Sequence, residues 1–387
     1  MDFLSWAWNK RNMAKKLTTA TLLVATAEEA SNLRYACGFT APDAVVFLKH
    51  GSARHLVVPP LELGRAQQLG GQTRIWTPAD LDVSDHERRT LSGWTLGLLR
   101  KLKLDAVQVS RTFPLHMARA LESEGIRVDV CDTSLFPKRV IKSEQEIDNI
   151  REAQRAAVAA MRKAQQCIQQ ANVDRQGKLI WKNKTLTSER VRFEIDVTLL
   201  HRNCIAQETI VAGGRQGADP HERGSGPLYA GQPIVLDIFP QHRGHGYWGD
   251  ITRTVINGTP HPEVLRMYHA VKKAQREALA MVRPGARADR IHQHVDQVLK
   301  EAGFETSVSN GVAQGFFHST GHGVGLDIHE APRISSSRQT LKKGHVITIE
   351  PGLYYPSLGG IRIEDTVAVT ADGFEMLAGM KKAFQLA

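Results

Sequence analysis

The sequence predicts an α/β (α+β) protein made of two successive domains. Over the first 140 residues, short apolar runs alternate with helix-like segments, which favours an α/β domain. Beyond that point, strand-like runs lie before and after a pair of helices, and a long amphipathic helix precedes them all. The predicted domains are therefore residues 1–140 and 141–387.

The first domain contains short runs of apolar and β-branched residues that have the length of strands. The stretch from Met13 to Ala27 has a faint likeness to a signal peptide, but four threonines interrupt its apolar run. We therefore interpret the later part of this stretch as a buried strand. The predicted strands are residues 21–26, 44–48, 55–58 and 106–109, and a helix is predicted at residues 91–104.

The second domain opens with a clear helix start. Ser143 is a good N-cap residue, and Glu146 three positions later completes a capping box. Apolar residues then recur at helical spacing from Ile147 to Ile168, so this helix should reach about Asn172. Two more helices are predicted, one from Pro262 to the Pro284-Gly285 pair and one at residues 288–302, and strands are predicted at 234–239, 346–349, 361–363 and 366–369.

Composition argues against a membrane span and against a disulfide framework. No run of about 18 apolar residues occurs in the sequence. The four cysteines are widely spaced and include no CxxC pair, which is typical of reduced thiols in the cytoplasm. The 50 Lys+Arg and 40 Asp+Glu residues give a net charge of +10, but the basic residues are scattered. We therefore expect a solvated surface and neither a nucleic-acid nor a membrane partner.

Four carboxylates adjoin strand-like runs in the second domain, where burial makes an ionised acid costly. Asp237 lies inside one run, Asp250 precedes another, Glu350 ends a third and Glu364 follows a fourth. A carboxylate within a buried strand needs a partner charge or a metal ion. Histidines gather in the same region, since eleven of the 16 lie between residues 201 and 329. Together these acids and histidines indicate one shared site.

A glycine-rich loop surrounds His322 in the phrase HSTGHGVGLDIHE, residues 318–330. Its glycines let the backbone pack tightly behind the imidazole. The loop is not a zincin helix, because HExxH is absent. It is not a phosphate loop either, because its glycines do not fit GxGxxG and no GK[ST] follows.

These acids and His322, in this order, resemble the dinuclear metallopeptidases of the pita-bread fold, which include methionine aminopeptidase, aminopeptidase P and prolidase. The phrases that match are VLDIFP, GDITRT, HSTGHGVGLDIHE, ITIEPGLY and GGIRIEDT, within residues 141–387. More weakly, EEASNLRYACGF at residues 28–39 resembles the N-terminal domain shared by creatinase, prolidase and aminopeptidase P. The resemblance implies a creatinase/prolidase-like N-terminal α/β domain and a C-terminal pita-bread domain, whose curved antiparallel sheet is covered by helices.

The resemblance implies a pair of divalent metal ions. Asp237 would chelate one ion, His322 and Glu350 would hold the other, and Asp250 and Glu364 would bridge the pair. This oxygen-rich ligand set with one imidazole suits Mn²⁺ best, with Co²⁺, Fe²⁺ and Zn²⁺ as alternatives. A hydroxide bridging the two metals would attack the scissile carbonyl, with Glu350 as general base and proton shuttle.

Other polar residues match positions that surround the family's metal pair. The resemblance gives His221, His318 and His329 roles in catalysis and in holding the substrate, including stabilisation of the oxygen of the tetrahedral intermediate. Arg362 precedes Glu364 by two residues, so both can face one side of a strand. Arg362 could therefore pair with the acids of the site or bind the substrate, and a structural ion pair is an equal alternative.

Four further histidines are predicted to lie outside the site. His242 and His245 fall between the two aspartates, where this chain has twelve intervening residues and the family usually has ten. We interpret both as turn residues of a longer hairpin. His292 and His294 lie on the polar side of a predicted helix and are expected on the surface.

The predicted function is that of a metal-dependent exopeptidase that hydrolyses short peptides at Xaa-Pro bonds, as an aminopeptidase P or a prolidase. The two-domain layout favours these enzymes over methionine aminopeptidase, and the resemblance also implies a homodimer. Two alternatives stay open. One is a catalytically inert pita-bread binding module, which only the charge of +10 supports. The other is a creatinase-like amidinohydrolase, although its members lack the metal carboxylates.

Overall fold

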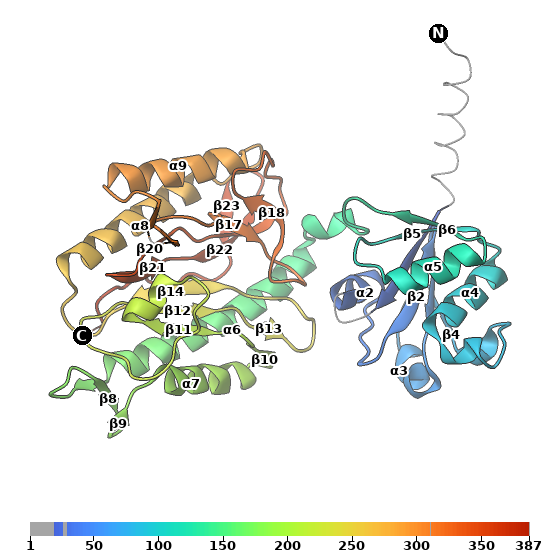
Figure 1. Ribbon diagram of the computed structural model, residues 1–387, viewed down its shortest axis with the longest axis horizontal. Coiled ribbons are helices and arrows are strands. Elements are labelled where there is room, and N and C mark those ends of the chain that lie inside the picture. The colour runs from blue at the N-terminus through green and yellow to red at the C-terminus, as the bar shows by residue number, and fades with distance from the viewer. Residues whose placement is uncertain (1–18, 26–28, 310, 387) are drawn as a thin grey trace, which may run out of the picture. The chain divides into compact units, whose positions relative to one another are not determined.

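The computed structural model describes residues 19–25, 29–309 and 311–386 and divides into two compact units (Figure 1). The first unit ends at Pro137 and the second begins at Lys138, close to the boundary expected after residue 140. Residues 1–18 and 26–28 of the first predicted domain lie outside the described residues.

The first unit is a six-stranded sheet with helices packed on both faces. Its strand order is β4-β3-β2-β1-β5-β6, with β2 antiparallel to its two neighbours and the remaining pairs parallel. Side chains alternate along β1, so Leu22 packs into the apolar cluster under α4 and α5, whereas Leu23 packs into the cluster under α2 and α3. The strands are β1 (Ala20–Ala25), β2 (Val45–His50), β3 (Ala53–Val57), β4 (Thr73–Trp76), β5 (Ala106–Val109) and β6 (Arg127–Val130), and the helices are α2 (Ala30–Cys37), α3 (Leu63–Ala66), α4 (Leu91–Leu102) and α5 (Leu115–Ser123).

The second unit places antiparallel strands between two pairs of helices (Figure 1). One apolar cluster joins α6 and α7 to the sheet β11-β12-β14, and another joins α8 and α9 to the sheet β18-β17-β19-β22-β23. The helices are α6 (Glu144–Gln169), α7 (Ser188–Leu200), α8 (Pro262–Ala280) and α9 (Ala288–Glu301). The strands of these two sheets are β11 (Ile210–Gly213), β12 (Ile234–Ile238), β14 (Ile251–Val255), β17 (Gly321–Gly323), β18 (Glu330–Ile334), β19 (Val346–Ile349), β22 (Asp365–Val369) and β23 (Phe374–Met376).

Short strands complete the second unit. The hairpin β20 (Gly352–Tyr355) and β21 (Gly359–Arg362) lies between β19 and β22 in the chain. The others are β7 (Asn172–Val173), β8 (Leu179–Trp181), β9 (Lys184–Thr185), β10 (Cys204–Ile205), β13 (Gln241–His242), β15 (Ser307–Ser309) and β16 (Val312–Gln314). Within the part of the chain that the structure describes, no helix has both the length and the apolar character that crossing a bilayer requires.

The helices and strands predicted from sequence are confirmed. The predicted strands correspond to β1, β2, β3, β5, β12, β19, β21 and β22, and the predicted helices to α4, α6, α8 and α9. At the start of α6, the Ser143 hydroxyl accepts from the Glu146 amide, and the Glu146 carboxylate accepts from the Ser143 amide at 2.8 Å, so the capping box is present. The helix ends at Gln169, a few residues before the predicted end.

Threonine side chains join β14 to β21 of the β20-β21 hairpin and to β22 of the five-stranded sheet. The Arg362 amide donates to Thr254 Oγ1 at 2.9 Å, and Thr366 Oγ1 donates to the Asp250 carbonyl at 2.8 Å. This junction fixes the ends of strands from these sheets beside one another, and the predicted site residues lie at those ends.

Candidate metal centre and active site

The strands of the second unit bring the five predicted metal ligands to one cavity. Asp237 lies in β12, Asp250 directly precedes β14, His322 lies in β17, Glu350 follows β19, and Glu364 lies between β21 and β22. Ligand atoms of Asp250, His322 and Glu364 lie within 4.8 Å of one another. All five residues line a cavity of about 670 Å³, a volume that is typical of small-molecule sites.

His322 presents an unprotonated nitrogen to two of the carboxylates. Its Nε2 lies 3.6 Å from Asp250 Oδ2 and 3.3 Å from Glu350 Oε1. Its Nδ1 lies 3.1 Å from the Gly323 carbonyl oxygen, which can only accept, so Nδ1 carries the ring proton. Burial lowers the pKa of His322, so the ring stays neutral. A neutral imidazole with a lone pair aimed at carboxylates is the form that binds a metal ion.

The carboxylates are too close together and too deeply buried to be ionised at once without cations. Burial and the charges of Glu364 and Asp237 raise the pKa of Asp250 well above its usual value. Burial and the charge of Glu350 raise the pKa of Glu364 in the same way. Burial raises the pKa of Glu350 to about 7, although the Arg362 guanidinium acts in the opposite direction. Divalent cations would remove this electrostatic cost.

One carboxylate oxygen of Asp237 is hydrogen-bonded, and the other has no hydrogen-bond partner. Its Oδ2 accepts from Arg362 Nη2 at 2.6 Å, and the Arg362 side chain is only 4% exposed. Of the roles predicted for Arg362, the structure therefore shows pairing with an acid of the site. Asp237 Oδ1 is buried without a hydrogen-bond partner, which is costly for a carboxylate. A pair of divalent cations fits this arrangement. The cations would satisfy the unpaired oxygen of Asp237, accept the lone pair of His322 and neutralise the closely spaced carboxylates.

A chain of hydrogen bonds occupies His318. Arg362 Nη1 donates to Tyr354 Oη at 2.7 Å, and the Tyr354 hydroxyl donates to His318 Nε2 at 2.9 Å. His318 Nδ1 donates to the Ser319 carbonyl at 2.7 Å. Burial, with a contribution from Arg362, lowers the pKa of His318 to about 3. His318 lines the cavity as a neutral ring, but both its nitrogens are already bonded within the protein.

His221 and His329 are the two predicted histidines that are exposed in the cavity. His221 precedes β12 and His329 directly precedes β18. The ring of His329 meets the ring of His322 edge to face, with centroids 4.4 Å apart. Partial burial and the neighbouring His322 lower the pKa of His329 to about 4. Both rings can therefore contact a bound molecule directly.

Three residues that line the cavity or pack beside it were not predicted from the sequence. Arg333 lies on β18, Tyr354 lies on β20, and the ring of Phe317 packs against Tyr354 with centroids 5.5 Å apart. Strands β18 and β20 were not predicted. Without a strand assignment, the alternation of side chains that points Arg333 and Tyr354 toward the cavity could not be applied.

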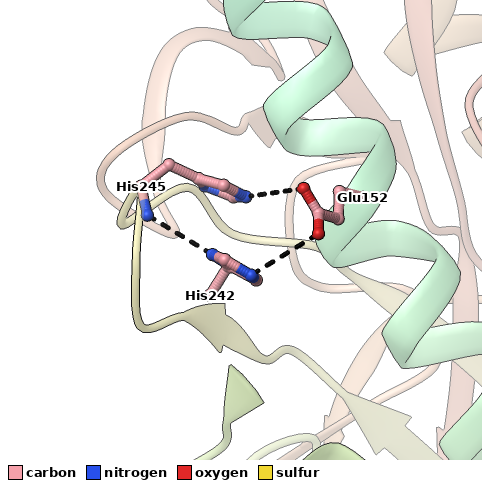
Figure 2. Close-up of side chains that lie close together, drawn as sticks. All are labelled: Glu152, His242 and His245. Carbon is pink, nitrogen blue, oxygen red and sulfur yellow. Dashed lines mark hydrogen bonds and ion pairs between the residues drawn. The ribbon is translucent and has the colours of Figure 1, made fainter. Parts of the chain in front are cut away.

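Figure 2 shows a second group of possible ligands, in which the rings of His242 and His245 stack and both face Glu152 of α6. Each Nε2 lies 3.6 Å from a Glu152 oxygen. His242 Nδ1 accepts from the His245 amide at 3.3 Å, and His245 Nδ1 accepts from the Tyr247 amide at 3.1 Å. The ring protons therefore lie on Nε2, which leaves no lone pair there for a metal ion.

His242 and His245 connect the segment between Asp237 and Asp250 to Glu152 of α6. His245 lies in the turn of this segment, as predicted, whereas His242 lies in β13 and pairs with Cys204 of β10. The prediction that both are turn residues is therefore wrong for His242. The twelve-residue spacing alone could not show that a short strand, β13, lies between the two aspartates.

The prediction that His292 lies on the surface is also wrong. His292 Nδ1 lies 2.9 Å from Thr320 Oγ1, and the ring packs on Phe316 with centroids 5.4 Å apart. Burial lowers the pKa of His292. Helical periodicity gave the polar side of α9 correctly, but it could not show that the His322 loop covers part of that side. His294, with a side chain that is 39% exposed, is closer to the prediction.

Metal binding to this centre should release protons, and it should release more of them at lower pH. Glu350, with a pKa of about 7, is mostly protonated at about pH 6 and mostly ionised at about pH 8. Because cations bind the ionised form, we expect the apparent affinity for Mn²⁺ to rise with pH while the number of protons released falls. Isothermal titration in buffers of different ionisation enthalpy measures both quantities. An affinity that is independent of pH would contradict this electrostatic account.

This chain is similar to a known metallopeptidase family and to proteins named as dipeptidases. The model of metallopeptidase family M24 matches residues 148–371. The Xaa-Pro dipeptidase of Pyrococcus furiosus is 36% identical over 243 residues, which are 62% of this chain and 63% of that protein. The match thus spans less than two thirds of that relative. A probable dipeptidase PepE of Mycobacterium tuberculosis is 34% identical over 341 residues, which are 84% of this chain and 80% of that protein.

Solved structures extend the likeness to both units. The prolidase of Pyrococcus horikoshii OT3 superposes with a TM-score of 0.79 at 26% identity, over 96% of this chain and 97% of that one. The X-Pro aminopeptidase of Thermotoga maritima superposes with a TM-score of 0.78 at 25% identity, over 95% of this chain and 97% of that one. The first unit, which the family model leaves out, therefore belongs to the shared architecture.

Proposed function

This chain belongs to metallopeptidase family M24, and on that premise we propose that it is a metal-dependent exopeptidase that hydrolyses Xaa-Pro dipeptides. The observation that carries the proposal is that four carboxylates and one neutral imidazole, whose unprotonated nitrogen can bind a metal ion, line a single cavity. The relatives named as Xaa-Pro dipeptidases support the substrate class.

Two divalent cations would be held by Asp237, Asp250, His322, Glu350 and Glu364, and when bound they would polarise the scissile carbonyl and bring the pKa of a water molecule near neutrality. We propose Mn²⁺ because oxygen ligands with one imidazole and no thiolate suit it best.

Side chains of the cavity would transfer the proton, bind the substrate and hold Arg362 in position. Glu350, at the open end of β19, would hold the proton of the attacking water and pass it to the leaving amine. His329 and His221 would donate hydrogen bonds to the substrate and to the oxygen of the tetrahedral intermediate. His318 and Tyr354 would keep Arg362 paired with Asp237, because their hydrogen bonds fix the guanidinium in place.

Arg333 is the residue to which we assign the preference for dipeptides. It is exposed at the cavity, and after burial, which is the main cause, its positive charge contributes to the lowered pKa of both His322 and His329, so its field reaches the site. A dipeptide places its C-terminal carboxylate one residue beyond the scissile bond. Replacing Arg333 with methionine should therefore raise KM for an Xaa-Pro dipeptide by about 10- to 100-fold, as expected for loss of a charge-assisted hydrogen bond.

Steady-state kinetics on paired substrates check this prediction. The matched substrate is the Xaa-Pro amide, which has no carboxylate and should keep its KM in the Arg333→Met variant. The matched variant is Arg338→Met, which removes an exposed arginine that does not line the cavity. Equal losses on the acid and the amide would show that Arg333 does not recognise the carboxylate.

Peptide hydrolysis by chelator-stripped protein, with and without added Mn²⁺, tests the proposed function. The substrates are an Xaa-Pro dipeptide, an Xaa-Pro-Xaa tripeptide and a Met-Ala-Xaa control. Metal-dependent cleavage of the dipeptide is the expected result. Cleavage of the tripeptide alone would indicate an aminopeptidase P, and cleavage of the control alone would indicate a general or methionine aminopeptidase. Metal binding without cleavage of any peptide would overturn the proposal.

The proposal also covers the location of the enzyme and its oligomeric state. All four cysteines are free thiols, which supports a reducing cytoplasm as its location. A homodimer is proposed from the resemblance to the family, and light scattering of the purified chain would decide it.

A further inference from the structure

The segment of residues 324–330 carries His329 and turns away from the metal centre just after His322. Its own backbone is tightly packed. The Gly325 amide donates to the Asp327 carbonyl at 3.1 Å, and a Cβ atom built on Gly325 would lie 2.5 Å from a carboxylate oxygen of Glu330. The segment therefore folds around the side chain of Glu330.

Glu330 is the anchor on the back of this segment. It is the first residue of β18 and directly follows His329, and successive side chains of an extended chain point to opposite sides. His329 faces the cavity, whereas the Glu330 side chain is 8% exposed. Glu330 Oε1 also accepts from the Asp327 amide at 3.1 Å. A displacement of Glu330 would move His329 by a similar distance.

Two buried cations hold this anchor, and both come from the start of the second unit. Lys142 Nζ lies 2.8 Å from Glu330 Oε2, and the Lys142 side chain is 1% exposed. Arg139 Nη2 donates to Glu330 Oε1 and lies 2.8 Å from Asp327 Oδ2. The group has two positive and two negative charges, so it is balanced. Burial by itself raises the pKa of Glu330, but Lys142 and Arg139 outweigh it and keep the carboxylate ionised.

The cations are themselves fixed. The Lys142 amide donates to the Gly344 carbonyl at 2.8 Å, and α6 begins two residues later with its capping box. On the other side of the segment, Trp248 donates from its amide to the Gly325 carbonyl and from its indole to the Leu326 carbonyl, each at 2.9 Å. The segment is therefore held from two directions, by cations at Glu330 and by Trp248 at residues 325–326.

We infer that Lys142 and Arg139 are positioning residues for catalysis, which act through Glu330 to hold His329 at the reacting groups. The inference rests on the function proposed above, because it gives His329 a substrate to contact. The cations themselves are buried behind the segment and do not line the cavity. A shift of about 1 Å in a catalytic group lowers turnover by as much as about 100-fold, so small movements of the segment matter.

The test compares Lys142→Met with Lys142→Arg and with wild type. In Lys142→Met we expect kcat for an Xaa-Pro dipeptide to fall by about 10- to 100-fold, with metal content unchanged and KM within a factor of about three. Lys142→Arg restores the charge and should recover most of kcat. The matched control is Arg287→Met, which breaks an ion pair with the buried Asp289 at the start of α9 and should keep kcat.

A double-mutant cycle separates positioning from general destabilisation. If Lys142 acts through His329, Lys142→Met in a His329→Ala background should lower kcat by less than about two-fold further. An equal loss in both backgrounds would overturn the inference, because it would show a general structural role. Glu330→Gln, which keeps the shape of the anchor, should behave like Lys142→Met.

Hydrogen exchange supplies a readout that does not depend on activity. In metal-free protein, amides of residues 324–330 should exchange faster in Lys142→Met than in wild type, and unchanged exchange would overturn the inference. If wild type hydrolyses no peptide, the proposed function fails, and exchange alone then decides whether the cations hold the segment.

Discussion

Replacing Glu364 with alanine should cost the protein its metal pair and lower turnover by about a thousand-fold or more, which corresponds to about 4 kcal/mol of lost transition-state stabilisation. Glu364 is 2% exposed, and its Oε2 accepts from Thr252 Oγ1 at 2.7 Å, so its carboxylate is held in one orientation. Its ligand atoms lie within 4.8 Å of those of Asp250 and His322, where a bridging ligand would lie. Asp250→Ala should behave in the same way.

Metal analysis and steady-state kinetics on the same preparation check this result. Glu364→Gln separates ligand loss from misfolding, because the amide can still accept from Thr252 but cannot neutralise two cations. The metal-free Glu364→Gln protein should be at least as stable as metal-free wild type, since one crowded acid is gone. Glu375→Ala, at an exposed position of β23, is the matched control and should retain both metals and rate. Full turnover in Glu364→Ala would refute the dinuclear assignment.

Replacing Arg253 with methionine should destabilise the second unit by about 3–5 kcal/mol, the usual cost of breaking a buried ion pair on one side. Arg253 is 1% exposed and lies 2.6 Å from Asp365 Oδ1, which is equally buried. The guanidinium also donates to the main-chain carbonyls of Thr252, Glu364 and Met380. Methionine fills much of the volume but leaves these oxygens without their donor.

Thermal unfolding of metal-free protein measures the effect of Arg253→Met. For a unit of this size, about 2–4 °C per kcal/mol converts the expected loss into a fall in Tm of roughly 6–20 °C. The control is Arg151→Met, whose arginine is 19% exposed and pairs at the surface with Glu375 at 2.9 Å, so that a change within about 1 kcal/mol is expected. Similar shifts in the two variants would show that burial of the Arg253 pair is not what matters.

Local patterns in the sequence were enough to predict many of the helices and strands and some of the site residues. The capping box at Ser143 predicted the start of α6 to the residue, because a cap is defined by neighbours three positions apart. Asp237 and Glu350 could be singled out because an acid within or at the end of an apolar run is unusual wherever it occurs. These two acids were therefore predicted from local signals, whereas His221, His318 and His329 were predicted from the resemblance to the family.

Features that depend on distant parts of the chain could not be predicted. Helix α7 was missed because its apolar residues do not form one stripe, and Phe193 is 65% exposed while Leu199 is fully buried. The bonds of His318 to Tyr354 and of Lys142 to Glu330 join residues 36 and 188 positions apart. No periodicity reports contacts of that range, so the support behind the site became visible only in the structure.

The arrangement of the proposed metal ligands also bears on when the chain could acquire metal ions. Asp237 and Glu364 are 127 residues apart in the chain, and the ligands between them come from strands of two different sheets. Contacts of such long range form late, after shorter-range structure is in place. A newly synthesised chain consequently has no binding site until most of the second unit has folded. With the proposed ligands, metal loading would therefore follow folding, and a truncated chain that lacks residues 346–369 would have neither Glu350 nor Glu364 with which to retain the ions.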